Sequence, residues 1–263
     1  MPLPSLLIVG AQKSGTTWLH RALKRSHHLV AHPRRKELDF FLRPDYAERL
    51  DDYAAGFPDD PKARYVFESS PNYFRPPTGD RDIAARIATS LPGVETLAIL
   101  RNPVERYLSA YIHNMMKGRL PYAAEITDFT DNHLLLSHGD YAALLDHWWR
   151  HLPRLRVYFH DDLTANRAAF LTRVMADLGL DRDVPDKALK FRANARDRKI
   201  RDLDWDRMPV LSFELRERLR DHFAPGIARL QAMTGRDLSG WLADDQEAQD
   251  TQRMAQGSTS SRG

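Results

Sequence analysis

The stretch LLIVGAQKSGTTWLHRALK, residues 6–24, joins a short apolar run to a helix-period segment through a loop with two glycines. The run Leu6–Val9 is typical of a strand that is buried in a sheet, and Thr16–Lys24 is predicted to be a helix. Gly10 and Gly15 let the backbone turn tightly, and the amide groups that open the helix point toward an anion. The sequence therefore predicts a strand, an anion-binding loop and a helix in direct succession.

The same alternation of strand and helix recurs twice. Two further pairs follow: Val94–Leu100 with Val104–Met116, and Leu155–Phe159 with Leu163–Leu178. Strands that alternate with helices indicate βαβ units around a parallel sheet. We predict an α/β fold, a single P-loop-like domain over residues 1–243 with a central parallel sheet flanked by helices. The polar, Gln- and Ser-rich residues 244–263 are predicted to form a disordered tail.

Two helices are expected near the end of this domain. Leu211, Leu215 and Leu219 have the spacing of an amphipathic helix. Pro225 suits the first turn of a following helix, and Gly235 suits its carboxyl-terminal stop.

Composition excludes several kinds of site and partner. The 263 residues include no cysteine, which rules out disulfides, thiolate zinc sites and a cysteine nucleophile. The 39 basic and 36 acidic residues are interspersed, without the basic stripe of a nucleic-acid binder, so no nucleic acid partner is predicted. No apolar run approaches the roughly 18 residues of a membrane span, and no signal peptide is recognised. We expect a cytoplasmic protein with no integral membrane segment, and leave its oligomeric state open.

The loop after the first strand supplies charge and hydroxyl groups for an anion through Lys13, Thr16 and Thr17. The Walker A loop of nucleotide kinases has its lysine directly after the second glycine, where this chain has Thr16. The strand Val94–Leu100 runs into Arg101, and no convincing Walker B aspartate is present. A P-loop kinase that uses ATP and magnesium remains an alternative with these two features against it.

The loop and a second segment together resemble the sulfotransferases that use 3′-phosphoadenosine-5′-phosphosulfate (PAPS). Their 5′-phosphosulfate loop commonly reads Lys-Ser/Thr-Gly-Thr-Thr after a strand, and Leu97-Ala-Ile-Leu-Arg-Asn-Pro-Val-Glu-Arg-Tyr-Leu-Ser109 is similar to their 3′-phosphate segment. The resemblance implies that Arg101 and Ser109 bind the 3′-phosphate. It also implies a set of cofactor-binding residues in the loop: Lys13, Ser14, Gly15, Thr16, Thr17 and Trp18.

Three more segments resemble the branch that includes heparan sulfate sulfotransferases and their bacterial relatives. They are Lys36-Glu-Leu-Asp-Phe-Phe41, Phe67-Glu-Ser-Ser-Pro-Asn-Tyr-Phe74, and Leu215 to Trp241 with its Thr-Gly-x-Asp-Leu ending. The resemblance implies that Glu37 is the catalytic base. This chain departs from the branch at Ser69, where those enzymes carry lysine, and in lacking their disulfide, so their acceptor site does not transfer by analogy.

The chemistry of sulfuryl transfer fits these residues. An acceptor hydroxyl loses a proton to a base while charge grows on the departing phosphate oxygen, and Glu37 and Lys13 supply the base and the cation. His113 matches a histidine of the N-sulfotransferase members and is a further catalytic candidate, although a surface helix histidine fits equally well. The basic stretch 192–201 lies where the family has a loop over the nucleotide. Its candidates for the 3′-phosphate are Arg196, Arg198 and Lys199, and a solvated charged face is the alternative.

The sequence therefore predicts a PAPS-dependent sulfotransferase that releases 3′-phosphoadenosine-5′-phosphate (PAP) and needs no metal. The expected acceptor is a hydroxyl of a carbohydrate, a lipid-linked sugar or a small metabolite, with an amine as the alternative. Besides the kinase, a non-catalytic module that binds a nucleotide or polyanion remains open, and it would keep its function without Glu37.

Overall fold

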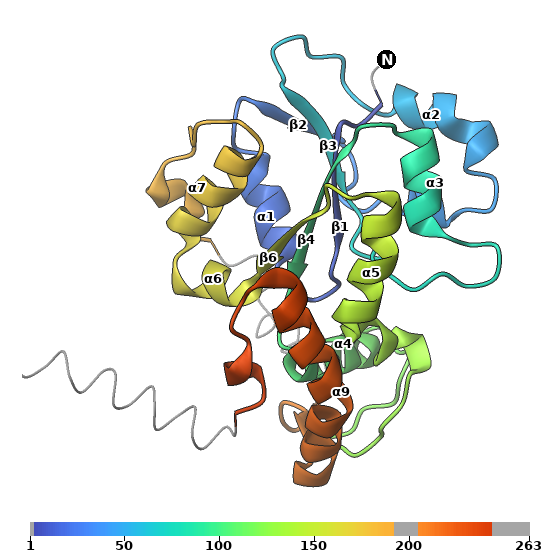
Figure 1. The fold of residues 1–263 in the computed structure, drawn as a ribbon, viewed down its shortest axis with the longest axis vertical. Coiled ribbons are helices and arrows are strands. Elements are labelled where there is room, and N and C mark those ends of the chain that lie inside the picture. The colour runs from blue at the N-terminus through green and yellow to red at the C-terminus, as the bar shows by residue number, and fades with distance from the viewer. Residues whose placement is uncertain (1–2, 192–204, 244–263) are drawn as a thin grey trace, which may run out of the picture.

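Across residues 3–191 and 205–243, the part of the chain that the computed structural model describes, five parallel strands form one sheet in the order β2-β3-β1-β4-β6 (Figure 1). The strands are β1 (Leu6–Gly10), β2 (Leu29–Ala31), β3 (Tyr65–Ser69), β4 (Glu95–Leu100) and β6 (Arg156–Phe159). β1 is central: Leu6 pairs with Phe67 of β3 on one side and with Glu95 of β4 on the other. The predicted parallel sheet and α/β fold are confirmed.

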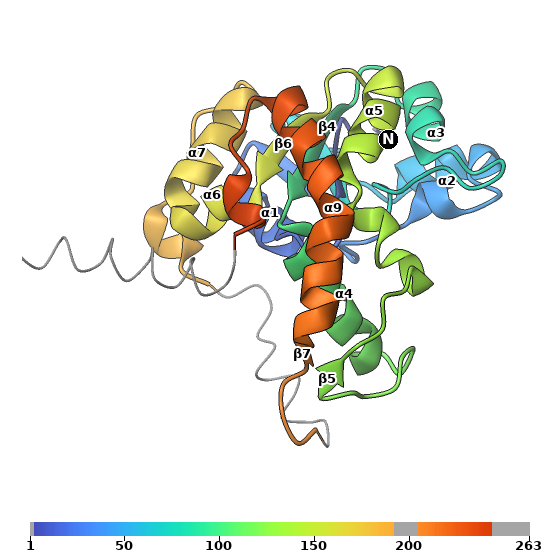
Figure 2. The same ribbon diagram turned by 60° about the horizontal axis from the view of Figure 1, so that its bottom comes forward.

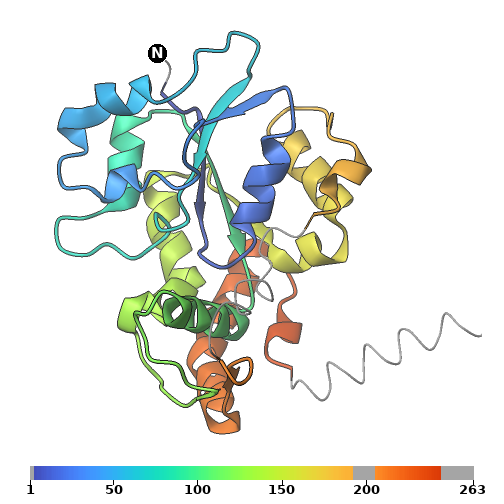
Figure 3. The same cartoon turned by 180° about the vertical axis from the view of Figure 1, so that it is seen from behind.

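Helices cover both faces of this sheet, which is why its strands are apolar on both sides (Figures 1 and 3). Leu6 and Ile8 pack in the core beneath α1 (Thr16–Leu23) and α7 (Arg167–Asp177). Leu7 and Val9 point to the opposite core, which is covered by α3 (Ile83–Ser90) and α5 (Tyr141–His151). Because successive side chains of a strand point to opposite faces of the sheet, alternate residues of β1 contribute to two separate cores.

The other helices lie mainly around the carboxyl ends of the strands. α4 (Pro103–Met116) and α9 (Phe213–Thr234) pack against each other there (Figure 2). α6 (His160–Ala165) follows β6 directly, and α2 (Leu50–Ala55) lies on the same side of the sheet as α3 (Figure 1). A second pair of parallel strands, β5 (Glu125–Ile126) with β7 (Val210–Leu211), joins the segment after α4 to the start of α9.

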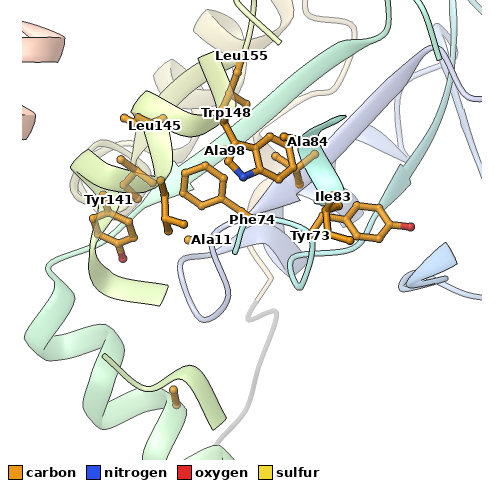
Figure 4. Packing of buried hydrophobic residues seen from close by; sticks show 14 of the residues in the cluster. Ala11, Tyr73, Phe74, Ile83, Ala84, Ala98, Tyr141, Leu145, Trp148 and Leu155 are labelled. Atoms are coloured by element: carbon orange, nitrogen blue, oxygen red, sulfur yellow. The ribbon is translucent and has the colours of Figure 1, made fainter. Parts of the chain in front are cut away.

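A close contact at the end of β1 explains the first glycine of the loop. The Phe74 amide donates to the Val9 carbonyl at 2.9 Å, and its ring packs on the fully buried Trp148 with centroids 5.4 Å apart (Figure 4). A Cβ atom on Gly10 would lie 2.3 Å from the Cβ of Phe74. Only glycine leaves room for this approach.

The predicted helix Leu163–Leu178 is wrong in one respect, because the structure divides it. Asn166 has extended backbone angles between α6 and α7, and its side chain accepts a hydrogen bond from the Ala169 amide at 3.0 Å. Asparagine is a strong amino-terminal cap. Capping therefore overrides the apolar periodicity that continues across the break.

The prediction of a new helix at Pro225 is also wrong, because α9 runs through it. The proline is exposed, so the carbonyl of Asp221 that loses its helical partner also lies on the solvent side. A continuous buried stripe holds the helix together on its other side: Leu215, Leu219, Phe223, Ile227 and Leu230. Gly235 ends the helix in the left-handed conformation, as predicted.

The sequence analysis left out two strands, and one of its predictions falls on residues that the structure does not describe. Strands β2 and β3 were not predicted from the sequence. The proposed tail 244–263 lies outside the described residues. Within the described ranges, no helix combines the length and apolar character that crossing a membrane requires.

Candidate active site

A cavity of about 560 Å³ opens at the carboxyl ends of β1 and β4. At this point the chain leaves β1 toward α1 in one core and leaves β4 toward α4 in the other. Such a switch point is where open α/β sheets bind ligands. The cavity has the size of a small-molecule site. It gathers most of the residues that the sequence predicts: Lys13, Gly15, Thr16, Thr17, Trp18, Glu37, Arg101, Ser109 and His113.

The other predicted site residues lie elsewhere or beyond the description. Ser14 is fully buried beneath the loop and does not line the cavity. Arg196, Arg198 and Lys199 lie outside the described residues.

The loop between β1 and α1 has the backbone of an anion-binding turn. Lys13 and Gly15 both have left-handed angles, with φ of 70° and 97°. Turns of this kind point successive amide groups into one concavity. A Cβ atom on Gly15 would lie 2.7 Å from Cδ2 of Leu163 and 3.2 Å from Cδ2 of His160. The start of α6 thus presses on the loop, and position 15 requires glycine for both conformation and space.

Arg101 is fixed beside this loop by three elements. Its Nη1 donates to the carbonyl oxygen of Lys13 at 3.4 Å, and its Nη2 lies 3.3 Å from Glu105 on α4. Glu105 also pairs with Arg216 of α9 at 3.3 Å. The guanidinium and the buried Ser109 of α4 line the same cavity. A forked cation and a hydroxyl suit a phosphate group.

Several lining residues were missed by the sequence analysis: Gln12, Asn72, His160 and Arg167. His160 follows β6 directly, so its place at the carboxyl end of a strand was the available signal. Burial and the nearby Arg101 lower the pKa of His160 to about 4. Its imidazole is therefore neutral near pH 7 and acts as a hydrogen-bonding group.

Glu37 lies in a segment that follows β2, residues 36–42, which we call the base segment after the predicted catalytic base. Its end, Phe40 and Phe41, packs in the core on the α3 side of the sheet. Its carboxylate is 46% exposed and accepts a hydrogen bond from Nζ of Lys36 at 2.7 Å. Glu37 lines the cavity together with Lys13. The cavity therefore has both a carboxylate, which can accept a proton, and an ammonium group, which can stabilise a growing negative charge.

The base segment is held by side chains that follow β3. Oγ of Ser70 accepts hydrogen bonds from the amides of Leu38 and Asp39 at 3.1 and 3.0 Å. Asn72 donates to the Asp39 carboxylate at 3.0 Å and accepts from Gln12 at 3.2 Å. A chain of hydrogen bonds therefore links the anion-binding loop to the base segment.

The buried carboxyl group of Glu68 on β3 is part of the hydrogen bonding that holds the base segment. Oε2 of Glu68 accepts a hydrogen bond from the hydroxyl of Tyr53 at 2.8 Å. Burial raises the pKa of Glu68 to about 7, against the opposing effect of hydrogen bonds from Tyr53, Tyr73 and Ser70. Tyr73 in turn accepts from the amide of Phe41 at 3.4 Å. These hydroxyl groups tie the end of the base segment to β3.

Ser69 points away from the cavity. It is fully buried, and its Oγ lies 2.9 Å from Nδ1 of His20 on α1. Burial and nearby lysines lower the pKa of His20 to about 3, so the imidazole is neutral. Ser69, one of the departures noted in the sequence, therefore makes an interior contact between β3 and α1.

The described part of the chain holds two groups of side chains with metal-ligand spacing. Neither group lines the cavity.

Comparison with known proteins gives one family. Residues 3–192 match the family described as "Sulfotransferase domain". A mouse protein, "Heparan sulfate glucosamine 3-O-sulfotransferase 3B1", is 27% identical over 91% of this chain and 65% of its own length. Human "Heparan sulfate glucosamine 3-O-sulfotransferase 6" is 29% identical over 90% of this chain and 73% of its own length. The chain thus spans slightly less than two thirds of the mouse relative.

A solved structure agrees with these sequence matches. The sulfotransferase from Alicyclobacillus acidocaldarius superimposes with a TM-score of 0.72 and 26% identity, over 92% of this chain and 100% of that one. The matched residues include both strands that bound the cavity and the loop between β1 and α1. The chain therefore belongs to the sulfotransferase family.

Proposed function

We propose that the chain transfers a sulfuryl group from PAPS to a hydroxyl group of an acceptor. The observation that carries the proposal is the cavity at the ends of β1 and β4, which Lys13, Glu37 and Arg101 all line. Membership of the sulfotransferase family supports the same reaction.

The described residues fit the two anionic ends of PAPS. The loop amides and Lys13 suit the 5′-phosphosulfate, and Arg101 with Ser109 suits the 3′-phosphate. The Trp18 ring lines the cavity, and its buried Nε1 has no hydrogen-bond partner among the described residues. Trp18 also stacks on Phe191 with ring centroids 5.8 Å apart. These rings offer an aromatic surface for the adenine of PAPS.

The charges of the site assign a role to each of two residues. When bound, PAPS supplies the sulfuryl group that forms a new bond to the acceptor oxygen as its bond to the phosphate oxygen breaks. Glu37 accepts the proton that the acceptor hydroxyl loses. Lys13 and the loop amides compensate the negative charge that grows on the departing phosphate. His113 lines the same cavity and is available to contact the acceptor.

The acceptor belongs to the proposal as well. The relatives act on heparan sulfate glucosamine according to their names, and this makes a carbohydrate hydroxyl the first acceptor class to test. Because Ser69 is turned into the interior, this chain offers no side chain to the acceptor at that position. We therefore expect a carbohydrate or smaller hydroxyl acceptor that differs from heparan sulfate.

Calorimetric titration with PAP, and separately with ATP and magnesium, tests the proposal. PAP should bind without metal, and Lys13→Ala and Arg101→Ala should each weaken binding about 10- to 100-fold, because each removes a charge-assisted hydrogen bond. Lys62→Ala changes an exposed lysine outside the cavity and serves as the control. Preference for ATP with magnesium would favour a P-loop kinase. Retention of full PAP affinity in both variants would place the nucleotide elsewhere.

A further inference from the structure

Three side chains of types that bind metals, Asp82, His147 and His151, come together where α3 begins and along α5. Both helices lie on the sheet face opposite α1 and α7 (Figure 1). Asp82 precedes α3, and His147 and His151 lie one turn apart on α5. The two helices lie side by side and are in contact. None of the three residues lines the cavity of the candidate active site. The sequence analysis did not anticipate this group, because Asp82 is remote from the two histidines along the chain.

The donor atoms already converge. Oδ1 of Asp82 lies 2.9 Å from Nε2 of His147, and Oδ2 lies 3.5 Å from Nε2 of His151. The imidazole centroids are 5.0 Å apart. Around a tetrahedral zinc ion, with bonds of about 2.0–2.1 Å, two donors are separated by about 3.3 Å. With one donor atom taken from each residue, the three donors all lie within 4.8 Å of one another, so small side-chain rotations would bring them to that separation.

The backbone holds these ligands in place. Residues four apart on a helix project from the same face, which is the arrangement of paired histidines in zinc-binding helices. Asp82 is the amino-terminal cap of α3, and its Oδ1 accepts from the Ala85 amide at 3.1 Å. A second-sphere hydrogen bond of this kind orients a ligating carboxylate.

The group is half-buried rather than sealed. The side chains of His147, Asp82 and His151 are 16%, 28% and 35% exposed. An ion can therefore enter from solvent, and a water molecule can complete the coordination. Two imidazoles and one carboxylate with one open position form a ligand set that zinc uses in proteins.

We propose that Asp82, His147 and His151 form a zinc-binding site that joins α3 to α5. Bound Zn²⁺ links the segment that leads from β3 into α3 with the helix that packs on Phe74 through Trp148. Its contribution is to the stability of this face of the domain, because a ligand that binds only the folded state raises its stability. The site is independent of the proposed sulfuryl transfer.

The second group, His27, His28 and Asp183, provides an internal control. There the two histidines are consecutive, and the side chain of His27 is 74% exposed. Asp183 already accepts from the backbone amide of His27 at 2.8 Å. Adjacent histidines in a turn lack the fixed spacing of two histidines on one helix face.

The test is calorimetric titration of the chelator-treated full chain with ZnCl₂. One equivalent should bind to the wild-type protein, and thermal unfolding should shift to higher temperature with zinc. Asp82→Asn keeps a good helix cap but removes the carboxylate, and His151→Gln removes one imidazole. Each should weaken zinc binding by at least about tenfold and reduce the thermal shift measured at the same zinc concentration. His27→Gln should leave both unchanged.

Two results would overturn the assignment. One is a wild-type protein that binds no zinc, which would leave only a hydrogen-bonded histidine–aspartate group. The other is binding that survives in His151→Gln and disappears in His27→Gln, which would place the ion at the other group. Because His151 is partly exposed, its variant decides the question even if Asp82→Asn fails to fold.

Discussion

The anion-binding loop, residues 10–17, and the base segment, residues 36–42, face the same cavity but are built differently. The loop follows β1 and leads directly into α1; Gly15 permits its left-handed turn, and Gly10 leaves room for Phe74. The base segment has little regular structure and takes its position from Ser70, Asn72 and Tyr73, which follow β3. One half of the site is therefore recognisable within one short stretch of sequence, although contacts with Phe74 and Arg101 also hold it, and the other half takes its position from segments far away in the sequence.

The largest expected effect separates the two regions functionally. Glu37→Gln should lower kcat about 10²- to 10⁴-fold, because general-base catalysis contributes on that scale. PAP affinity should stay unchanged, since the loop does not depend on this carboxylate. Steady-state kinetics and PAP calorimetry measure the two effects, with Glu48→Gln as a control outside the cavity. A parallel loss of PAP affinity would mean that the two regions act as one unit.

A smaller effect is expected from the hydroxyl that positions the base segment. Ser70→Ala removes the acceptor of two backbone hydrogen bonds, each worth about 1 kcal/mol. We expect kcat to fall about tenfold, with little change in the Kd for PAP. Ser26→Ala is a matched control, because the Oγ of this buried serine accepts one amide hydrogen bond in a turn away from the cavity. Equal kcat values in the two variants would show that Ser70 does not position the base.

The third prediction concerns the pH dependence of stability, with no change in turnover implied. Glu68 has a pKa of about 7 in the folded protein, above its ordinary value of 4.5, because it is buried. The folded state thus holds this proton more tightly than the unfolded chain does. The group's contribution to stability is fully present below about pH 4.5 and is lost as the pH rises through about 7.

Urea unfolding of wild type and Glu68→Gln at about pH 5 and about pH 8 measures this contribution. The wild-type free energy of unfolding should fall relative to the variant by about 1–3 kcal/mol between the two values. Identical pH profiles would mean that Glu68 titrates normally in the folded state. A difference would show that the support of the base segment responds to pH through a group that the loop lacks.

The sequence was sufficient where structure is local. Three strands with helical segments after them and the loop after β1 with Lys13 follow from apolar runs and glycines within short stretches. Arg101 and Ser109, which also line the cavity, follow from the family resemblance of one short segment. Capping by Asn166 and the solvent-facing Pro225 altered helix boundaries, since both effects depend on how a helix end or face is satisfied. Hydrophobic periodicity alone does not predict where a helix is capped or whether it continues through a solvent-facing proline.

The sequence was insufficient where distant segments meet. β3 contains the fully buried Glu68, so its apolar pattern is interrupted, and its hydroxyl partners come from other elements. Gln12 and Asn72 carry no motif that marks them as a link between the loop and the base segment. The aspartate that faces His147 likewise comes from a separate helix start. These relationships arise only when the sheet brings the segments together.

The central place of β1 has a consequence for the order of events during synthesis. Leu6 leaves the ribosome well before its partners Phe67 and Glu95. The buried strand β1 is therefore synthesised long before the two strands that pair with it. Non-local pairing of this kind slows folding and leaves apolar strands exposed meanwhile. The anion-binding loop is anchored by the hydrogen bond from the Ala11 amide to the Ile99 carbonyl, which forms only after β4 has emerged. The earliest part of the site to be translated therefore cannot complete its contacts until β4 has followed it.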